Sequence, residues 1–403
     1  MSSLRNDIAA RDGGFTLIEI LVVSGLLAVL LGALVELTSR GAELFDRGTR
    51  GQELADEATV AMRRVRESLD ALAGPFPGWR GSDLPEARLI VSEAPLGLRD
   101  TLPGAGEAAA AHPAPRLQVL RSTVQLEPRH EEALLKTAVA DFVERTQGPG
   151  VAEEIVAQHL AQWPRRGRGE LLLLPWPSDS SGVFMELRVG ERLADPELRP
   201  EGKLAITDIA TVEELALDPK EVVATTYAVL GGLLHFEMEF WSQRTQSWNA
   251  SGTRGGSVAW DSARAGLFVV EQGRDPLFAL DRDPSSLGDA RDDVWPRFVR
   301  VTMVVSSGAS TSPEAYLVGA LGASDTELRV SRDDELPDPA ENPWLKVGAE
   351  WVKFGEVSGR RVGGLVRGGR GTLPAEHKSG DPVRIGRQVV TVIPLRCGRD
   401  SDD

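Results

Sequence analysis

The stretch GGFTLIEILVVSGLLAVLLGALVEL, residues 13–37, decides how the rest of the chain is organised. From Phe15 onward it is an apolar run of about 20 residues, long enough to cross a bilayer as an α-helix. Glu19 is the exception, because a carboxylate in hydrocarbon is costly unless it has a partner. Gly13 and Gly14 stand directly before the run, where small, flexible residues give a peptidase access to the backbone. The stretch therefore predicts a membrane-spanning helix that carries one functional acid and follows a cleavage site.

The same residues resemble the prepilin-type signal of type IV pilins and pseudopilins. They match that signal position by position at Gly13, Gly14, Phe15, Thr16, Leu17, Ile18 and Glu19. The resemblance implies that a membrane prepilin peptidase cuts after Gly14 and that Phe15 becomes the N-methylated amino terminus. It also implies that Glu19 pairs with the N-terminal ammonium of a neighbouring subunit and sets the axial register between subunits. An ordinary signal anchor that carries a carboxylate is the alternative.

The composition limits the partners that the rest of the chain can have. With 403 residues, the chain is longer than one typical domain. Its formal net charge of -15 argues against nucleic acid as a partner, since phosphates would be repelled. Cys397 is the only cysteine, so no intramolecular disulfide forms and the fold depends on burial alone.

A second helical pattern continues the N-terminal helix. Apolar residues recur at spacings of three and four and form one stripe: Leu54, Ala58, Met62, Val65, Leu69 and Leu72. Gly74, Pro75 and Pro77 then end the pattern. We expect one helix from Phe15 to Ala73, with a bend or frayed stretch at the glycines of its middle, Gly41, Gly48 and Gly51. A long helix that is apolar in its first half and amphipathic in its second is typical of pilin-like subunits.

The body after the helix is predicted to be a β-sheet with a helical insertion. Short strands are expected at 87–91, 116–124, 170–174, 183–189 and 203–209, and two amphipathic helices at 131–146 and 151–163. Packing of these helices on the sheet is favoured over a role as a partner surface. Leu234, Phe236, Met238 and Phe240 alternate with polar residues, as in a half-buried strand.

Two blocks of the body resemble the minor pseudopilin J of type II secretion systems. Residues 230–261 combine an alternating strand, a polar turn, Trp248 and Trp260. Residues 295–305, WPRFVRVTMVV, resemble the proline-led strand of that family, with Val299, Val301, Met303 and Val305 in alternation. Because the two blocks follow a pilin-like helix in this order, they favour the minor pseudopilin J over the other minor pseudopilins.

The acidic segment 281–293, DRDPSSLGDARDD, suggests calcium, because hard cations prefer clustered carboxylates on a flexible loop. The candidate ligands are Asp281, Asp283 and Asp292. The sixth place of the segment holds Ser286, however, where an EF-hand-like loop has glycine. A solvated acidic loop is therefore favoured, and no cofactor is expected.

Residues 306–386 are predicted to form an inserted β-rich module with short strands and tight glycine turns. Part of it resembles a small module of phage-type and surface structural proteins, through Arg367, Gly368, Gly371, Thr372, His377 and Gly380. Arg367 and His377 are expected to cross-link loops by hydrogen bonds, and an active-site role for His377 is disfavoured. Residues 387–395 return as a final body strand that pairs with the strand at 297–305.

The whole chain predicts an α+β fold in which a long pilin-like helix packs on an antiparallel β-sheet body. The expected segments are a leader 1–14, a helix 15–73 with its transmembrane part at about 15–37, a body 78–305 with a helical insertion at about 131–163, the inserted module 306–386, a strand 387–396 and a tail 397–403. No histidine pair, nucleophile elbow, phosphate loop or dinucleotide fingerprint occurs, so we expect no enzyme.

We interpret the chain as a J-like minor pseudopilin of a type II secretion system. It would be anchored by one helix in the inner membrane with its body in the periplasm, as the resemblance implies. Its expected partners are other minor pseudopilins, the major pseudopilin and the prepilin peptidase. A minor type IV pilin and a membrane-anchored surface-binding module are the alternatives.

Overall fold

A computed structural model describes most of the secondary structure of the chain. The described residues are 17–72, 89–94, 117–165, 167–178, 183–193, 195–198, 223–242, 247–250, 258–262, 296–306, 313–333, 336–370 and 372–395. The chain divides into two compact units, Met1–Glu53 and Leu54–Asp403. The predicted class is confirmed: a long apolar helix is followed by an antiparallel β-sheet body, which makes the fold α+β.

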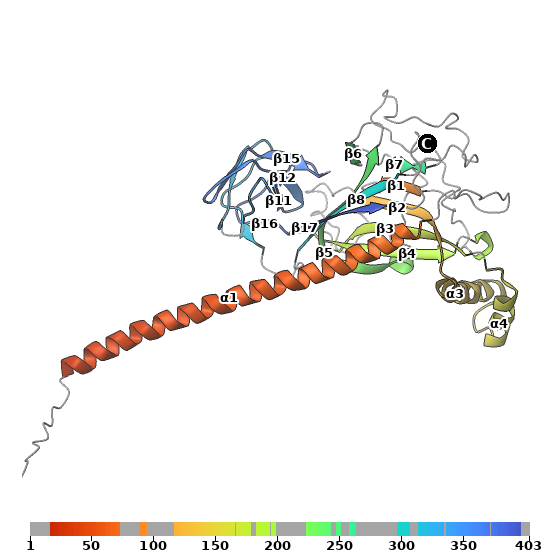
Figure 1. The fold of residues 1–403 in the computed structure, drawn as a ribbon, viewed down its shortest axis with the longest axis horizontal. Coiled ribbons are helices and arrows are strands. Elements are labelled where there is room, and N and C mark those ends of the chain that lie inside the picture. The colour runs from red at the N-terminus through yellow and green to blue at the C-terminus, as the bar shows by residue number, and fades with distance from the viewer. Residues whose placement is uncertain are drawn as a thin grey trace, which may run out of the picture. The chain divides into compact units, whose positions relative to one another are not determined.

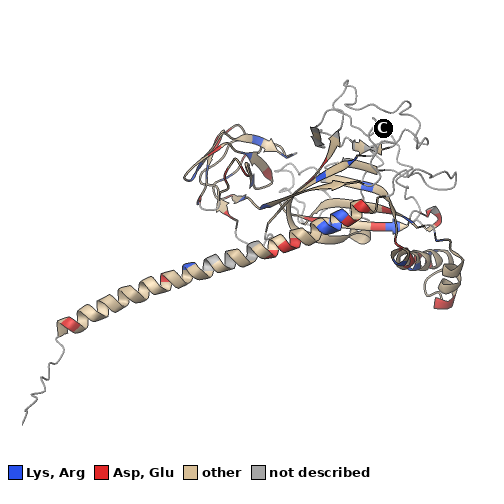
Figure 2. Cartoon of the chain, viewed as in Figure 1, with Lys and Arg blue, Asp and Glu red and all other residues tan. Residues whose placement is uncertain are grey.

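Helix α1 spans Leu17–Asp70. Its part from Leu17 to Ala42 is long and apolar enough to cross a membrane, and none of that stretch is buried. Figure 2 shows that charged residues are sparse along this part of α1 and are more frequent toward the C-terminal part of the helix. The helix continues without interruption through the glycines at 41, 48 and 51, so the prediction of a frayed stretch is wrong. Each glycine weakens a helix by only about 1 kcal/mol, which the neighbouring turns tolerate.

The C-terminal part of α1 belongs to the core of the second unit. Most of the predicted stripe is confirmed, because Ala58, Met62, Val65 and Leu69, with Leu72 just beyond the helix, are buried in the main hydrophobic cluster. Leu54, the first residue of the predicted stripe, is only partly buried. On another face of the helix, Arg64 donates hydrogen bonds from Nη2 to the Tyr227 hydroxyl at 2.6 Å and to Glu191 at 3.1 Å. Both apolar burial and polar contacts therefore hold this part of α1 to the body.

Among the described residues, the main sheet has nine antiparallel strands (Figure 1). Its strands are β1 (Leu89–Ala94), β2 (Leu117–Gln125), β3 (Arg168–Pro177), β4 (Met185–Leu193), β5 (Tyr227–Ser242), β6 (Ser247–Ala250), β7 (Val258–Asp261), β8 (Phe298–Val305) and β17 (Arg387–Pro394). The order is β17-β8-β5-β4-β3-β2-β1-β7, and β6 pairs with the end of β5. The strand expected at 203–209 lies outside the described residues.

From Phe236 to Phe240 the alternation in β5 separates the two faces of this sheet, as predicted. Leu234 was predicted to share that face but packs with Trp351 in a separate cluster, because the register shifts between Leu233 and His235. Phe236, Met238 and Phe240 are buried in the same cluster as the stripe of α1. Glu237 and Glu239 come between them and therefore project from the opposite face. We call this opposite face the outer face of the sheet.

Two helices cover another part of the body. Helix α3 spans Pro128–Gln147 and buries Leu135, Val139 and Val143 in the main cluster. Helix α4 spans Glu153–Gln162, has no buried residue, and contributes partly buried apolar side chains such as Ile155. Both match the predicted helices, and α3 packs on the body, which was the favoured role.

Eight short strands form two further sheets in the segment between β8 and β17. They are β9 (Ala315–Tyr316), β10 (Glu327–Arg329), β11 (Trp344–Val347), β12 (Glu350–Lys353), β13 (Glu356–Ser358), β14 (Arg361–Gly363), β15 (Val366–Gly369) and β16 (Pro382–Arg384). Their orders are β10-β14-β13 and β15-β12-β11-β16-β9. A separate hydrophobic cluster, which includes Val330, Leu345, Val352 and Val362, fills this module.

The final strand pairs as predicted. β17 is antiparallel to β8 from Arg387↔Val305 to Pro394↔Phe298, without a bulge. The module is therefore inserted between two strands that are neighbours in one sheet. The predicted domain boundaries stay a prediction, because contacts group body and module in one compact unit.

Removal of a stripe residue tests the packing of α1 on the sheet. Leu69→Ala should lower the free energy of unfolding by about 3 kcal/mol, because it leaves a cavity in a core that relaxes only partly. Val60→Ala is the matched control, since Val60 lies on the same helix and is 60% exposed. Urea denaturation of the full chain in detergent would measure both, and equal stability of the two variants would contradict this packing.

Candidate functional site

The first candidate site is the apolar part of α1. Glu19 lies in the first turn of the helix, where the helix dipole favours a carboxylate. The remaining charged residues between Leu17 and Ala42 are Glu36 and Arg40, near the other end of the stretch, which pair with each other at 2.6 Å. Glu19 therefore lies in a continuous surface of exposed apolar side chains, among them Ile18, Leu21, Val22 and Val23.

Other predicted site residues lie outside the described part of the chain. These are Gly13, Gly14 and Phe15 of the processing signal and Asp281, Asp283 and Asp292 of the calcium candidate. Cleavage, methylation and calcium binding therefore stay predictions. In the described residues, no three His, Cys, Asp or Glu side chains form a group that could hold a metal ion.

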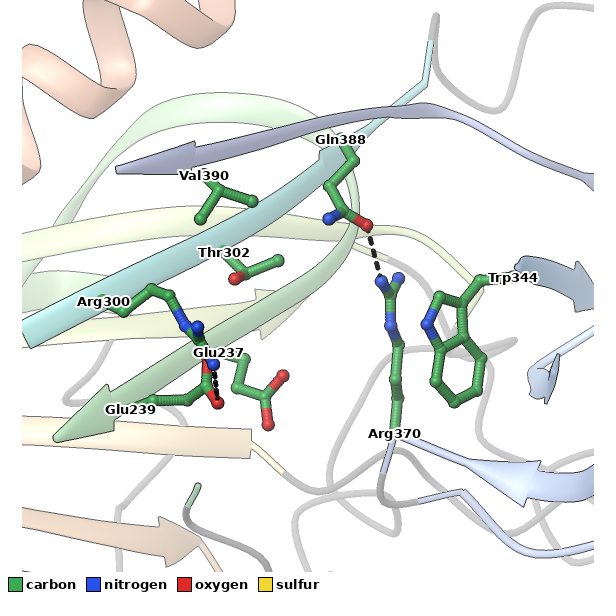
Figure 3. Close-up of a pocket in the computed structure, with 8 residues that line it drawn as sticks. All are labelled: Glu237, Glu239, Arg300, Thr302, Trp344, Arg370, Gln388 and Val390. Carbon is green, nitrogen blue, oxygen red and sulfur yellow. Dashed lines mark hydrogen bonds and ion pairs between the residues drawn. The ribbon is translucent and has the colours of Figure 1, made fainter. Parts of the chain in front are cut away.

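The second candidate site is a cavity of about 460 Å³ between the outer face of the sheet and the module (Figure 3). Its lining residues are Glu237, Glu239, Arg300, Thr302, Trp344, Arg370, Gln388 and Val390. The first four and the last two come from β5, β8 and β17, whereas Trp344 and Arg370 come from the module. The cavity thus joins residues that are more than 150 positions apart in sequence.

Ion pairs and ring contacts organise the walls of this cavity. Arg300 pairs with Glu239 across the β5–β8 register and stacks over Trp248, with its guanidinium carbon 4.8 Å from the ring centroid. Arg370 Nη2 donates a hydrogen bond of 2.8 Å to Gln388 Oε1. Sequence analysis missed Arg370, because its neighbours in the cavity belong to distant strands.

The N-terminal sequence can be compared with known protein families. Residues 10–35 match the prokaryotic N-terminal methylation motif. This match supports a type IV pilin-like protein and covers the predicted signal from Gly13 to Glu19. A pilin-like motif implies processing by a prepilin peptidase and assembly with other pilin-type subunits. No curated protein and no solved structure matches the chain.

A buried cluster in the module holds the loops that reach the cavity. Glu350 accepts hydrogen bonds from Arg367 Nε and Nη2 at 2.8 and 2.7 Å, and from His377 Nε2 at 2.8 Å. It also accepts from the backbone N–H groups of Gly368 and Ala375 at 2.9 and 3.0 Å. The predicted cross-linking by Arg367 and His377 is confirmed, and both act through Glu350, which the sequence reasoning missed.

These contacts decide the protonation state of Glu350. Burial alone raises the pKa of this carboxyl, but hydrogen bonds from His377, Arg367 and the two backbone N–H groups outweigh it and lower the pKa to about 2. His377 has its side chain only 1% exposed and directed at a structural carboxylate. The geometry therefore gives His377 a role in holding the module together.

The lowered pKa predicts how stability depends on pH. The unfolded chain protonates Glu350 near the ordinary pKa of 4.5, whereas the folded chain does so only near 2. The stabilisation, about 3 kcal/mol, is therefore fully present above about pH 5 and is lost as the pH falls toward 2. Glu350→Gln should lower the free energy of unfolding at pH 7 and flatten its pH dependence between 5 and 2.

Urea denaturation at a series of pH values would measure this dependence. Glu327→Gln is the control, because Glu327 forms an exposed pair with Arg361 in the same module. An unchanged pH dependence in the Glu350 variant would contradict the assignment.

Proposed function

We propose that this chain is a J-like minor pseudopilin of a type II secretion system, a non-enzymatic structural subunit at the tip of a periplasmic pseudopilus. The observation that carries the proposal is the apolar part of α1, which begins within the matched methylation motif, has no buried residue and holds Glu19 in its first turn. Apolar surface of this extent needs a membrane or neighbouring helices to cover it.

Glu19 would supply the specific step in assembly. Cleavage after Gly14 would give each subunit a new N-terminal ammonium group at Phe15. The ammonium of one subunit would then lie beside Glu19 of an adjacent subunit. A carboxylate and an ammonium attract strongly where water is excluded, and each alone is costly there. Their pairing would therefore favour one axial register of packed helices over others.

The body supports the choice of J within the pilin-like class. Trp248 packs edge-on against Trp241, with 5.3 Å between ring centroids, and Trp260 packs against Phe240 at 5.1 Å. Trp248 and Trp260, the two tryptophans of the J-like block, thus pack against aromatic side chains at the end of β5. The body would lie in the periplasm and contact the secretion channel or its cargo, with the inner membrane, the prepilin peptidase and other pseudopilins as partners. A minor type IV pilin is the alternative and would assemble by the same helix.

Substitution of Glu19 tests the assembly step. Glu19→Val should leave the protein processed and inserted in the membrane but reduce its incorporation into the tip complex roughly tenfold, as expected for a lost pairing of about 1.4 kcal/mol. Co-purification with tagged partner pseudopilins would measure incorporation. Glu36→Val is the control, because Glu36 pairs with Arg40 of its own chain. Normal incorporation of the Glu19 variant would refute the role of this residue.

The amino terminus provides a second test. Mass spectrometry of the protein purified from its own membrane should find a chain that begins at N-methylated Phe15. Gly14→Val should block the cleavage, because the peptidase needs a small residue before the bond. A purified chain that still begins at Met1 would overturn the proposal.

A further inference from the structure

The outer face of the main sheet is polar where it lines the cavity. Cross-strand neighbours Glu237↔Thr302↔Val390 form one row over β5, β8 and β17, and Glu239↔Arg300 belongs to the next. The module covers part of this face through Trp351, which packs in a small cluster with Phe184, Leu234 and Val304. The cavity begins where this apolar contact ends.

Arg370 is held at the rim by an unusual set of constraints. Its guanidinium carbon lies 4.5 Å from the ring centroid of Trp351 and 4.9 Å from that of Trp344. Its φ of 49° places it in the left-handed region, the one such non-glycine residue in the described part of the chain. Residues other than glycine rarely adopt this conformation, and strained backbone is often found at ligand clamps.

One nitrogen of this guanidinium orients Gln388. Nη2 donates to Gln388 Oε1, whereas Nη1 is buried and has no hydrogen-bond partner among the described residues. Because Nη1 is not exposed to solvent, an occupant of the cavity meets Gln388 rather than this nitrogen. Figure 3 shows the Gln388 amide nitrogen directed away from Arg370, which leaves it available as a further donor.

The charged groups that line the cavity balance one another. Glu239 is neutralised by Arg300, and Glu237 faces Arg370 across the cavity (Figure 3). Burial lowers the pKa of His235, the hydrogen-bond partner of Glu237, to about 4, so this ring is neutral at pH 7. Two carboxylates and two guanidiniums therefore sum to zero. The lining therefore has no net charge that would favour an ion of one sign.

We propose that this cavity binds an uncharged saccharide unit. Sugar hydroxyls would donate to Glu237 and accept from the amide nitrogen of Gln388, which Arg370 orients, and Thr302 would add one further contact. A volume of about 460 Å³ is within the range of small-ligand sites. The site goes beyond the proposed assembly role and does not depend on it.

The lining favours a saccharide over a peptide segment. Peptide docking usually relies on an apolar pocket that buries an anchoring side chain. Here the apolar contributions are Trp344 and Val390, whereas the other six lining side chains carry polar groups. Both donors and acceptors are present, as hydroxyl groups require.

Binding to the purified full chain tests the site. The chain is kept in an amine-oxide detergent, because maltoside and glucoside detergents would supply sugars. Glucose, galactose, N-acetylglucosamine and their disaccharides are titrated up to about 50 mM and followed by saturation-transfer NMR and tryptophan fluorescence. Glucuronate, glucosamine and a blocked alanine tetrapeptide test the charge and peptide alternatives.

Arg370→Gly provides the decisive variant, because glycine adopts a φ of 49° without strain and removes the guanidinium. Arg361→Ala is the control, since Arg361 is exposed in the same module and does not line the cavity. We expect saturable binding of a neutral saccharide that is weakened roughly tenfold or more by Arg370→Gly and unchanged by Arg361→Ala.

Four results would overturn the inference. These are the absence of saturable saccharide binding, stronger binding of the charged sugars, binding of the peptide alone, and equal binding by the Arg370→Gly variant. Circular dichroism of each variant ensures that a loss of binding is not a loss of the fold.

Discussion

The burial of one apolar helix stripe against one sheet face is the interaction on which the body of this protein depends. Ala58, Val65 and Leu69 of α1 share a cluster with Phe236, Met238 and Phe240 of β5. Because side chains alternate along a strand, this burial determines that Glu237 and Glu239 project from the other face. The polar character of the outer face therefore follows from the packing of the helix.

The outer face then carries the module. Lys346 of β11 is buried and donates hydrogen bonds from Nζ to the carbonyl oxygens of Val183 and Leu234, at 2.6 and 2.9 Å. Trp351 of β12 adds an apolar contact, and Arg370 adds a hydrogen bond to Gln388 of β17. A charge buried on backbone acceptors holds a defined geometry, because any shift would leave it without partners. These contacts give the cavity two walls within one compact unit.

The apolar part of α1 has the opposite character. None of its residues from Leu17 to Ala42 is buried, so packing within the protein does not explain why this segment is apolar. A surface of this kind is stable in a bilayer or among similar helices. The methylation motif at 10–35 agrees with this use, and it supports a chain that combines a pilin-like anchor with a body enlarged by the inserted module.

The sequence by itself determined the elements that depend on local periodicity. Four features could be predicted, because each follows from apolar residues that are contiguous or that recur every two or 3.6 residues. They are the apolar run after Gly14, the stripe of α1, the alternation of β5 and β8, and the pairing of β17 with β8. The methylation motif was equally local. Tertiary structure alone decided that Glu350 joins Arg367 and His377 and that a cavity forms around Arg370, since these residues come from separate segments and carry no shared pattern. Burial and hydrogen bonding give these side chains their roles, and both depend on neighbours that only the folded chain brings together.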